Sequence, residues 1–143
     1  MTPVAAAAVS GLAASTAELA ASASNVANAQ TVGPLAGSGW GPAAVVGSAG
    51  TGPSVQAYQP LTTVQSTTPG GGVATRFAAV SPGTQPAYDP QSPDADAQGL
   101  VAQPDVDETQ ESVNQIGALS AFQANLAVLR VSDEMQKSLL AIA

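Results

Sequence analysis

The chain of 143 residues contains no cysteine and no histidine. Without these side chains it has no thiolate nucleophile, no imidazole base and no histidine or cysteine ligand for zinc. Serine and threonine are plentiful, but no histidine is available to activate their hydroxyl groups. These absences exclude most hydrolase, redox and zinc chemistry. We therefore predict a protein that is not an enzyme, has no cofactor and has no metal site.

Basic residues are also scarce. Arg76, Arg130 and Lys137 stand against ten acids and leave a formal net charge of −7. Three residues cannot form the basic patch that neutralises phosphates, which excludes nucleic acid as a partner. No run approaches the roughly 18 apolar residues needed to span a bilayer, so we also predict no direct insertion into a membrane. No Lys or Arg precedes Glu18, which is not typical of a cleaved signal peptide.

Large apolar side chains are few as well. The hydrophobic content is 45%, but 30 of these residues are alanine, while leucine, isoleucine, valine and phenylalanine together number only 29. Aromatic residues make up 3% of the chain. Such a composition cannot fill a large single core. We expect an elongated molecule that completes its burial against other chains.

The beginning of the chain predicts a helix. Residues 4–29 are rich in alanine, the strongest helix former, and contain no proline after Pro3, which suits a helix start. Larger side chains follow the three- and four-residue steps of a coiled-coil seam, at Val9, Leu12, Leu19 and Val26. We expect this seam to pack on one face of the C-terminal helix in a coiled-coil-like pair. An ordinary amphipathic helix is the alternative, but so few large side chains would hold a single helix poorly.

Glycine and proline divide the middle of the chain. Residues 31–60 contain them too often for regular structure, which indicates a linker. Residues 61–67 and 73–80 are rich in valine and threonine and flank a Pro-Gly-Gly-Gly turn, which predicts a β-hairpin. A hairpin alone is marginal in water, so we expect it to pack on other strands or on neighbouring subunits. Residues 81–104 contain five prolines and are expected to be irregular.

The segment after residue 106 predicts a long helix. Asp107 starts a sequence with the spacing of a capping box, and no proline follows it. When residues are placed at 100° steps, the large side chains form two apolar faces, with Ser132 on the flank between them. One partner helix cannot cover both faces, so we expect similar subunits to pack on both sides. The first face comprises Leu119, Phe122, Leu126 and Leu129, and the second comprises Val113, Ala124, Val128, Val131, Met135, Leu139 and Ile142.

Together these segments predict an α+β fold that is mainly α. The N-terminal helix occupies residues 1–30 and the Gly/Pro-rich linker residues 31–60. A small β-rich region with an acidic turn occupies residues 61–106, and the C-terminal helix occupies residues 107–143. We expect the two terminal helices to form one axial core.

The acidic segment of residues 89–99 partly matches a calcium-binding loop. Counting from Asp94, Asp96 falls at the third position and Asp105 at the twelfth. Gln98 and Gly99 occupy the fifth and sixth positions. A proline on each side disfavours the helices that frame such a loop, so we favour turns closed by aspartate side chains bound to the backbone. A small secreted calcium-binding module is the alternative function.

Four motifs in the second half of the chain resemble a known family. Tyr-Asp-Pro-Gln-Ser-Pro-Asp-Ala-Asp at residues 88–96, Gly-Leu-Val at 99–101, Pro-Asp-Val at 104–106 and Ala-Phe-Gln-Ala-Asn at 121–125 are similar to the C-terminal signature of FlgC, a family of bacterial flagellar basal-body rod proteins. Ser-Asn-Val-Ala-Asn-Ala at residues 24–29 resembles the end of the first helix shared by rod and hook proteins. The residues that carry the resemblance are Asn25, Asn28, Tyr88, Asp89, Pro90, Pro93, Asp94, Asp96, Gly99, Pro104 and Asn125.

The resemblance implies a structural subunit of the proximal flagellar rod. In that family the terminal helices polymerise into the helical drive shaft used in flagellum-dependent motility, within the periplasm. The implied partners are copies of the chain itself, other flagellar rod proteins and the flagellar type III export apparatus, which exports without a cleaved signal. Another axial subunit, of the distal rod or of the hook junction, is the alternative within the flagellum.

Overall fold

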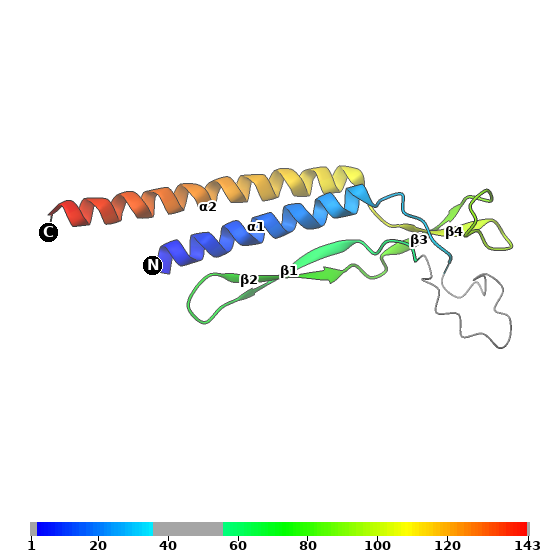
Figure 1. Ribbon diagram of the computed structural model, residues 1–143, viewed down its shortest axis with the longest axis horizontal. Coiled ribbons are helices and arrows are strands. Elements are labelled where there is room, and N and C mark those ends of the chain that lie inside the picture. Colours follow the sequence, from blue (N-terminus) through cyan, green and yellow to red (C-terminus); the bar gives the residue numbers. More distant parts are fainter. Residues whose placement is uncertain (1–2, 36–55, 143) are drawn as a thin grey trace.

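Two long helices and four short strands make up the part of the chain that the computed structural model describes, residues 3–35 and 56–142. The molecule is elongated, with its helices side by side (Figure 1). The predicted α+β class, mainly α, is confirmed, whereas the predicted linker falls largely on residues 36–55, outside the described residues. In chain order the elements are α1 (Pro3–Ala27), β1 (Leu61–Thr67), β2 (Val73–Ala79), β3 (Thr84–Tyr88), β4 (Leu100–Pro104) and α2 (Glu108–Ile142).

Both predicted helices are present, within a few residues of their predicted limits. Helix α2 starts after Asp107, whose Oδ1 accepts hydrogen bonds from the backbone N–H groups of Thr109 (2.8 Å) and Gln110 (3.1 Å). This N-cap satisfies two backbone donors that have no partner inside the helix. The Gln110 side chain donates to Asn114 (3.1 Å) instead of returning to Asp107, so the capping box is only half formed.

Helices α1 and α2 run antiparallel and contact each other through small side chains. On α1, Ala8, Ser15 and Ser22 are 3–4% exposed, and Ala118 on α2 is 3% exposed. A Cβ atom added to Gly11 would lie 2.5 Å from the side-chain oxygen of Asn125. The small side chains therefore let the two backbones approach closely, and many short-range contacts replace the interlocking of large side chains.

The predicted seam of α1 lies beside this contact rather than in it. Val9, Leu19 and Val26 are 42%, 41% and 38% exposed, and Leu12 is half-buried. The packing of these side chains on one face of the C-terminal helix in a coiled-coil-like pair stays a prediction. A heptad pattern marks a stripe that suits helix packing without indicating which helix it meets, and here the neighbouring stripe of small residues contacts α2.

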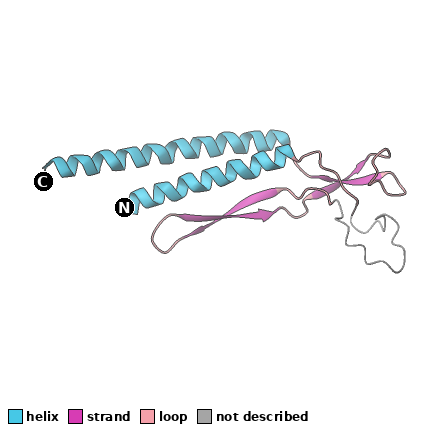
Figure 2. Ribbon diagram, in the orientation of Figure 1, coloured by secondary structure: helices cyan, strands magenta, loops and turns pink. Residues whose placement is uncertain are grey.

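The hairpin of β1 and β2 forms as predicted, with residues 61–67 paired antiparallel to residues 73–79. It lies along α1, which places α1 between the hairpin and α2 (Figure 2). At its tip the backbone N–H of Val73 donates to Oγ of Ser10 (3.1 Å). The hairpin thus packs on the first helix of its own chain rather than on other strands. Two strands that are marginal alone are held by a helix.

A second hairpin, of β3 and β4, occupies residues that the sequence predicted to be irregular. The prediction failed because prolines were taken to exclude strands. Pro86 lies in β3, which pairs on one side only, and Pro104 ends β4, and proline is tolerated in both places. Strand β4 is the best buried strand: Val101 is 0% exposed, and Ala102 pairs with Gly33 through two backbone hydrogen bonds of 3.0 and 2.8 Å.

Helix α1 is long and apolar enough, by length and composition alone, to cross a membrane. This differs from the expectation drawn from the sequence, because alanine counts as apolar on a hydropathy scale although it is small. In the structure α1 contacts α2 and the β1–β2 hairpin. The absence of membrane insertion stays a prediction.

Candidate assembly surface

The side-chain amide of Asn25 joins the end of α1, the start of β1 and the first turns of α2. Its Nδ2 donates to the Leu61 carbonyl oxygen (2.8 Å) and to the Glu111 carboxylate (2.7 Å), while its Oδ1 accepts from the Leu61 N–H (2.7 Å) and the Tyr58 hydroxyl (3.1 Å). Asn25 is 3% exposed. An amide that uses its donors and acceptors in this way fixes three elements relative to one another.

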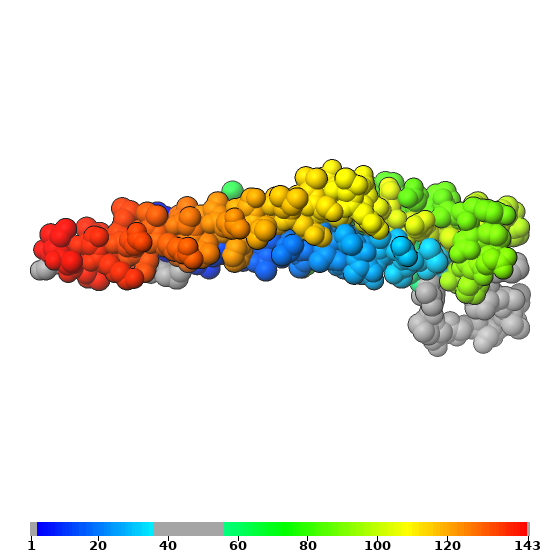
Figure 3. Space-filling view, turned by 90° about the horizontal axis from the view of Figure 1, so that it is seen from above, coloured from blue at the N-terminus to red at the C-terminus, as the bar shows by residue number. Residues whose placement is uncertain are grey.

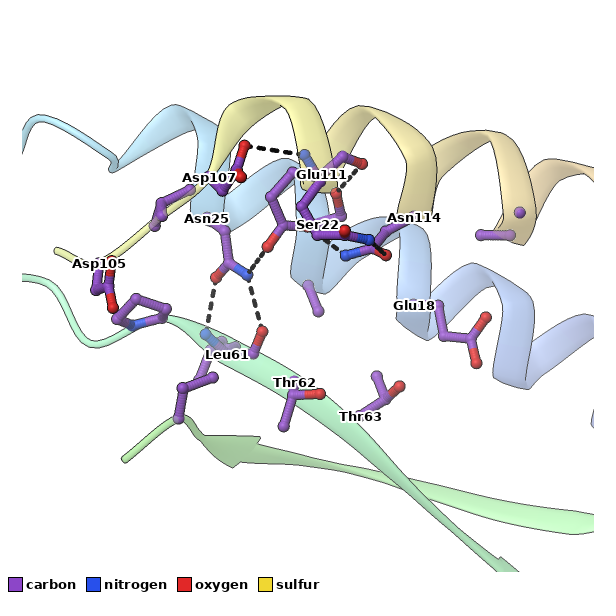
Figure 4. A pocket seen from close by; sticks show the side chains of 17 residues that line it. Glu18, Ser22, Asn25, Leu61, Thr62, Thr63, Asp105, Asp107, Glu111 and Asn114 are labelled. Carbon is purple, nitrogen blue, oxygen red and sulfur yellow. Dashed lines mark hydrogen bonds between the residues drawn. The ribbon is translucent and has the colours of Figure 1, made fainter. Parts of the chain in front are cut away.

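An open cleft of about 670 Å³ adjoins this amide (Figure 4). Its walls come from α1, β1 and the start of α2, and its charged lining consists of Glu18, Asp105, Asp107 and Glu111, without a Lys or Arg. Within the described residues, no three acidic side chains come together in a way that could hold a metal ion. The cleft can accept hydrogen-bond donors and cations, because it presents carboxylates and no positive charge of its own.

The acidic loop between β3 and β4 is closed by its own aspartates. Oδ1 of Asp96 accepts from the backbone N–H groups of Gln98 (2.9 Å) and Leu100 (2.8 Å), and Gly99 adopts a φ of +77°, which favours glycine. The prediction of turns closed by aspartate side chains is confirmed. Asp105, which falls at the twelfth position of the partial match to a calcium-binding loop, instead lines the cleft beside Asn25.

The other signature residues divide between the helices and this loop. On the helices, Asn28 donates to the Ser24 carbonyl oxygen (2.8 Å) and Asn125 to that of Ala121 (2.9 Å). In and beside the loop, Asp89 accepts from the Gln91 N–H (3.3 Å), Gly99 and Pro104 are buried and Asp94 is half-buried. The exposed members are Tyr88, Asp89, Pro90 and Pro93.

The two apolar faces predicted for the C-terminal helix lie on either side of α1. Helix α1 contacts the narrow strip between them, where Ala118 and Ser132 are buried. Ser132 lies on the flank between the two faces, as predicted, and it is buried there because α1 packs on this flank. On the first face Leu119 is 52% and Phe122 37% exposed, while Leu126 and Leu129 are half-buried.

The second face of α2 is more exposed than the first. Four of its members, Val128, Val131, Met135 and Leu139, line an apolar hollow of about 430 Å³ together with Val4 near the start of α1. Helix α2 continues past this point, and Figure 3 shows its outer surface along the whole helical part of the molecule. The exposed side chains of this face are Val113, Ala124, Val128, Val131, Met135, Leu139 and Ile142.

The arrangement can do little chemistry but offers extensive apolar contact. Sequence reasoning missed the partners of Asn25, because Leu61 and Glu111 lie 36 and 86 residues away from it. The sequence also gave no sign that the Asn125 side chain of the other helix lies against Gly11. The Asn at residue 25 was marked only by its place in a motif.

Comparisons with known proteins find similarity to flagellar basal-body rod proteins. Residues 97–142 match the family model described as flagellar basal body rod FlgEFG protein C-terminal. The chain is 33% identical over 139 residues to the flagellar basal-body rod protein FlgC of Salmonella typhimurium, with 93% of this chain and 90% of the relative covered. The protein of the same name from Yersinia enterocolitica is 34% identical over 141 residues, with the same coverage. The similarity therefore spans nearly the full length of both chains.

Proposed function

Because the chain belongs to the FlgC family of flagellar basal-body rod proteins, we propose that its two terminal helices pair as a coiled-coil-like unit and polymerise into the proximal rod. The chain is a structural subunit of the basal-body rod and not an enzyme. It is located in the basal body, where it assembles with copies of itself and with other rod proteins. In this position it serves flagellum-dependent motility.

The observation that carries the proposal is the exposure of both apolar faces of α2. Val131 and Met135 on the second face are 54% and 62% exposed, and Leu119 on the first face is 52% exposed. Monomeric proteins rarely leave such long apolar stripes in water. Since α1 packs on the strip between the faces, it leaves both free for neighbours. The α1 seam, in which Val9, Leu19 and Val26 are exposed and Leu12 is half-buried, adds a third stripe for the same use.

The flagellar type III export apparatus belongs among the proposed partners. A chain that is exported through a narrow channel must unfold first, and this chain has a thin core. Among the described residues, Val101 is the only large side chain that is fully buried. Little apolar burial therefore has to be given up on unfolding, which supports export of the whole chain.

A charge on the second face of α2 tests the assembly role. Val131→Asp should change the stability of the isolated subunit by no more than about 0.5 kcal/mol, because the side chain is 54% exposed. In the rod the same change buries an unpaired carboxylate in every copy, which costs several kcal/mol per interface. We therefore expect a strain that carries only Val131→Asp to export the protein but to lack complete rods and to be non-motile.

A control is Gln98→Asp, which adds the same charge at an exposed position of the loop between β3 and β4, away from both apolar faces. This strain should swim. The readouts are swimming in soft agar, the amount of protein exported and electron microscopy of isolated basal bodies. Normal rods and swimming with Val131→Asp would contradict the proposal.

A second candidate is another axial subunit, of the distal rod or hook junction. The observation that favours it is the match of residues 97–142 to a C-terminal model named after FlgE, FlgF and FlgG. This segment alone does not separate the axial subunits. The FlgC relatives, however, align over 90% of their length. Complementation of strains that lack single rod genes separates the candidates, and we expect motility to return only where FlgC is missing.

A further inference from the structure

We propose that a second copy of this chain places an apolar ridge in the groove between α2 and the β1–β2 hairpin, with its closest approach at Gly117. The proposal rests on the proposed function, in which copies meet inside the rod. Beyond that function, the inference specifies which two surfaces of the chain are in contact.

The groove runs along one side of α2. Its three hollows, of about 670, 440 and 430 Å³, are floored by α1 and follow one another along the helix. The hairpin forms the opposite wall of the first two, and the lining changes from polar to small to apolar toward the end of α2. Three- and four-residue steps place the α2 wall residues on one side of the helix. They are Gln110, Asn114, Gly117, Ala121, Val128 and Val131.

No contact within the described part of the chain requires a glycine at residue 117. A Cβ atom at this position would meet nothing within 4 Å, in contrast to Gly11, where it would strike Asn125. Glycine in the interior of a helix lowers stability relative to alanine. Gly117 is unfavourable for its own helix and faces open space in the groove. Close approach of a second copy of the chain at this point explains why the residue is a glycine.

The ridge lies on the opposite side of the helix pair. Gly117, Ala118 and Leu119 follow one another at 100° steps, so they face the groove, α1 and the ridge in turn. On α1, residues such as Ser10 contact the hairpin, while the stripe that starts at Val9 points away from it. The ridge consists of Val9, Leu12, Leu19 and Val26 of α1 with Leu119, Phe122, Leu126 and Leu129 of α2.

Charge favours a ridge-to-groove contact between copies. The polar end of the groove carries four carboxylates and no cation. Arg130 stands one turn after Leu126, on the ridge side of α2, and forms no ion pair within the described part of the chain, whereas Lys137 is paired with Asp133 (2.8 Å). Copies with a net charge of −7 repel one another except where a cation meets the acids of its neighbour. Because ridge and groove are different surfaces, the contact is heterologous and can continue into a helical array.

Substitutions of Gly117 show whether the glycine serves contact between copies or only the helix in which it lies. Gly117→Ala should raise the melting temperature of the purified subunit, because alanine favours the helix. In a strain with this variant alone we expect the yield of complete rods to fall about tenfold or more, because a clash at a packed contact removes at least one decade of affinity. Gly117→Leu should abolish rods. Gly70→Ala is the matched control, because a Cβ there also meets nothing within 4 Å, and it should leave rods intact.

Cysteine cross-linking identifies the occupant, since the native chain has no cysteine. Ala121→Cys, on the groove wall one turn after Gly117, is expressed in one strain together with each of the ridge variants Leu19→Cys, Leu119→Cys and Phe122→Cys in turn. At least one mixture should give a disulfide-linked dimer of this chain, which is absent when Ala121→Cys is expressed alone. The inference is overturned by normal rods with Gly117→Leu, by no dimer in any mixture, or by a cross-link to a different rod protein. The proposed function fails separately, if Val131→Asp leaves rods intact.

Discussion

Replacing Asn25 by aspartate should destabilise the subunit strongly although the shape of the side chain is kept. The change removes both N–H donors of the amide. The Leu61 carbonyl oxygen then loses its partner at 2.8 Å, and the Glu111 carboxylate at 2.7 Å faces a second negative charge. An unsatisfied buried acceptor costs about 1–3 kcal/mol, and loss of a hydrogen bond to a charged group costs roughly 1.5–3 kcal/mol. We expect a total loss of about 3–5 kcal/mol in the free energy of unfolding.

Urea unfolding followed by circular dichroism at pH 7 measures this loss. The control is Asn28→Asp, because Asn28 donates only to the Ser24 carbonyl oxygen of its own helix (2.8 Å), and about 1 kcal/mol is expected there. The folded state disfavours the charged form of the carboxyl introduced at residue 25, so its pKa is raised above the unfolded value. Protonation restores one donor, and the deficit of Asn25→Asp should therefore shrink as the pH falls through this raised pKa. Equal stability of Asn25→Asp and the native chain at pH 7 would refute the reasoning.

Two further predictions concern single contacts of the helices. Asp107→Ala removes the N-cap of α2, whose acceptor lies 2.8 and 3.1 Å from its two donors, and should lower the free energy of unfolding by about 1 kcal/mol in the same urea assay. An unchanged value would mean that the start of α2 is held by other contacts. Gly11→Val places carbon atoms where the Asn125 side chain lies and should cost roughly 1–3 kcal/mol, seen as a lower melting temperature. A melting temperature equal to that of the native chain would show that the helices can separate without loss.

The elements that sequence alone predicted are those with local causes. Helix α1 follows from alanine and Pro3, α2 from the Asp107 cap, and the first hairpin from a Pro-Gly-Gly-Gly turn between two β-prone segments. The second hairpin was missed because the prolines of residues 81–104 argue locally against strands. Its strand β4 forms because Val101 and Ala102 are buried, and burial depends on segments that are distant in the sequence.

The faces of the helices were predicted better than their partners. Periodicity gave two apolar faces on α2 and one stripe on α1, and the packing of the α1 stripe of Val9 and Leu19 on α2 stays a prediction. Small residues such as Ala8 and Ser15 form the buried part of the contact between the helices. A pattern of large side chains shows where a helix can pack, whereas the choice between its own chain and another copy depends on the whole assembly. The groove beside Gly117 has no sequence signal at all, because it needs three elements to form.

The measurement that tests assembly through the helices most directly is a cryo-electron-microscopy map of isolated basal bodies in which this chain can be traced. We predict that Val131 and Met135 on one face of α2, and Leu119 and Phe122 on the other, are all covered by neighbouring subunits in that map. A rod in which either face lies open along its length, with the contacts made by the hairpins instead, would contradict the account.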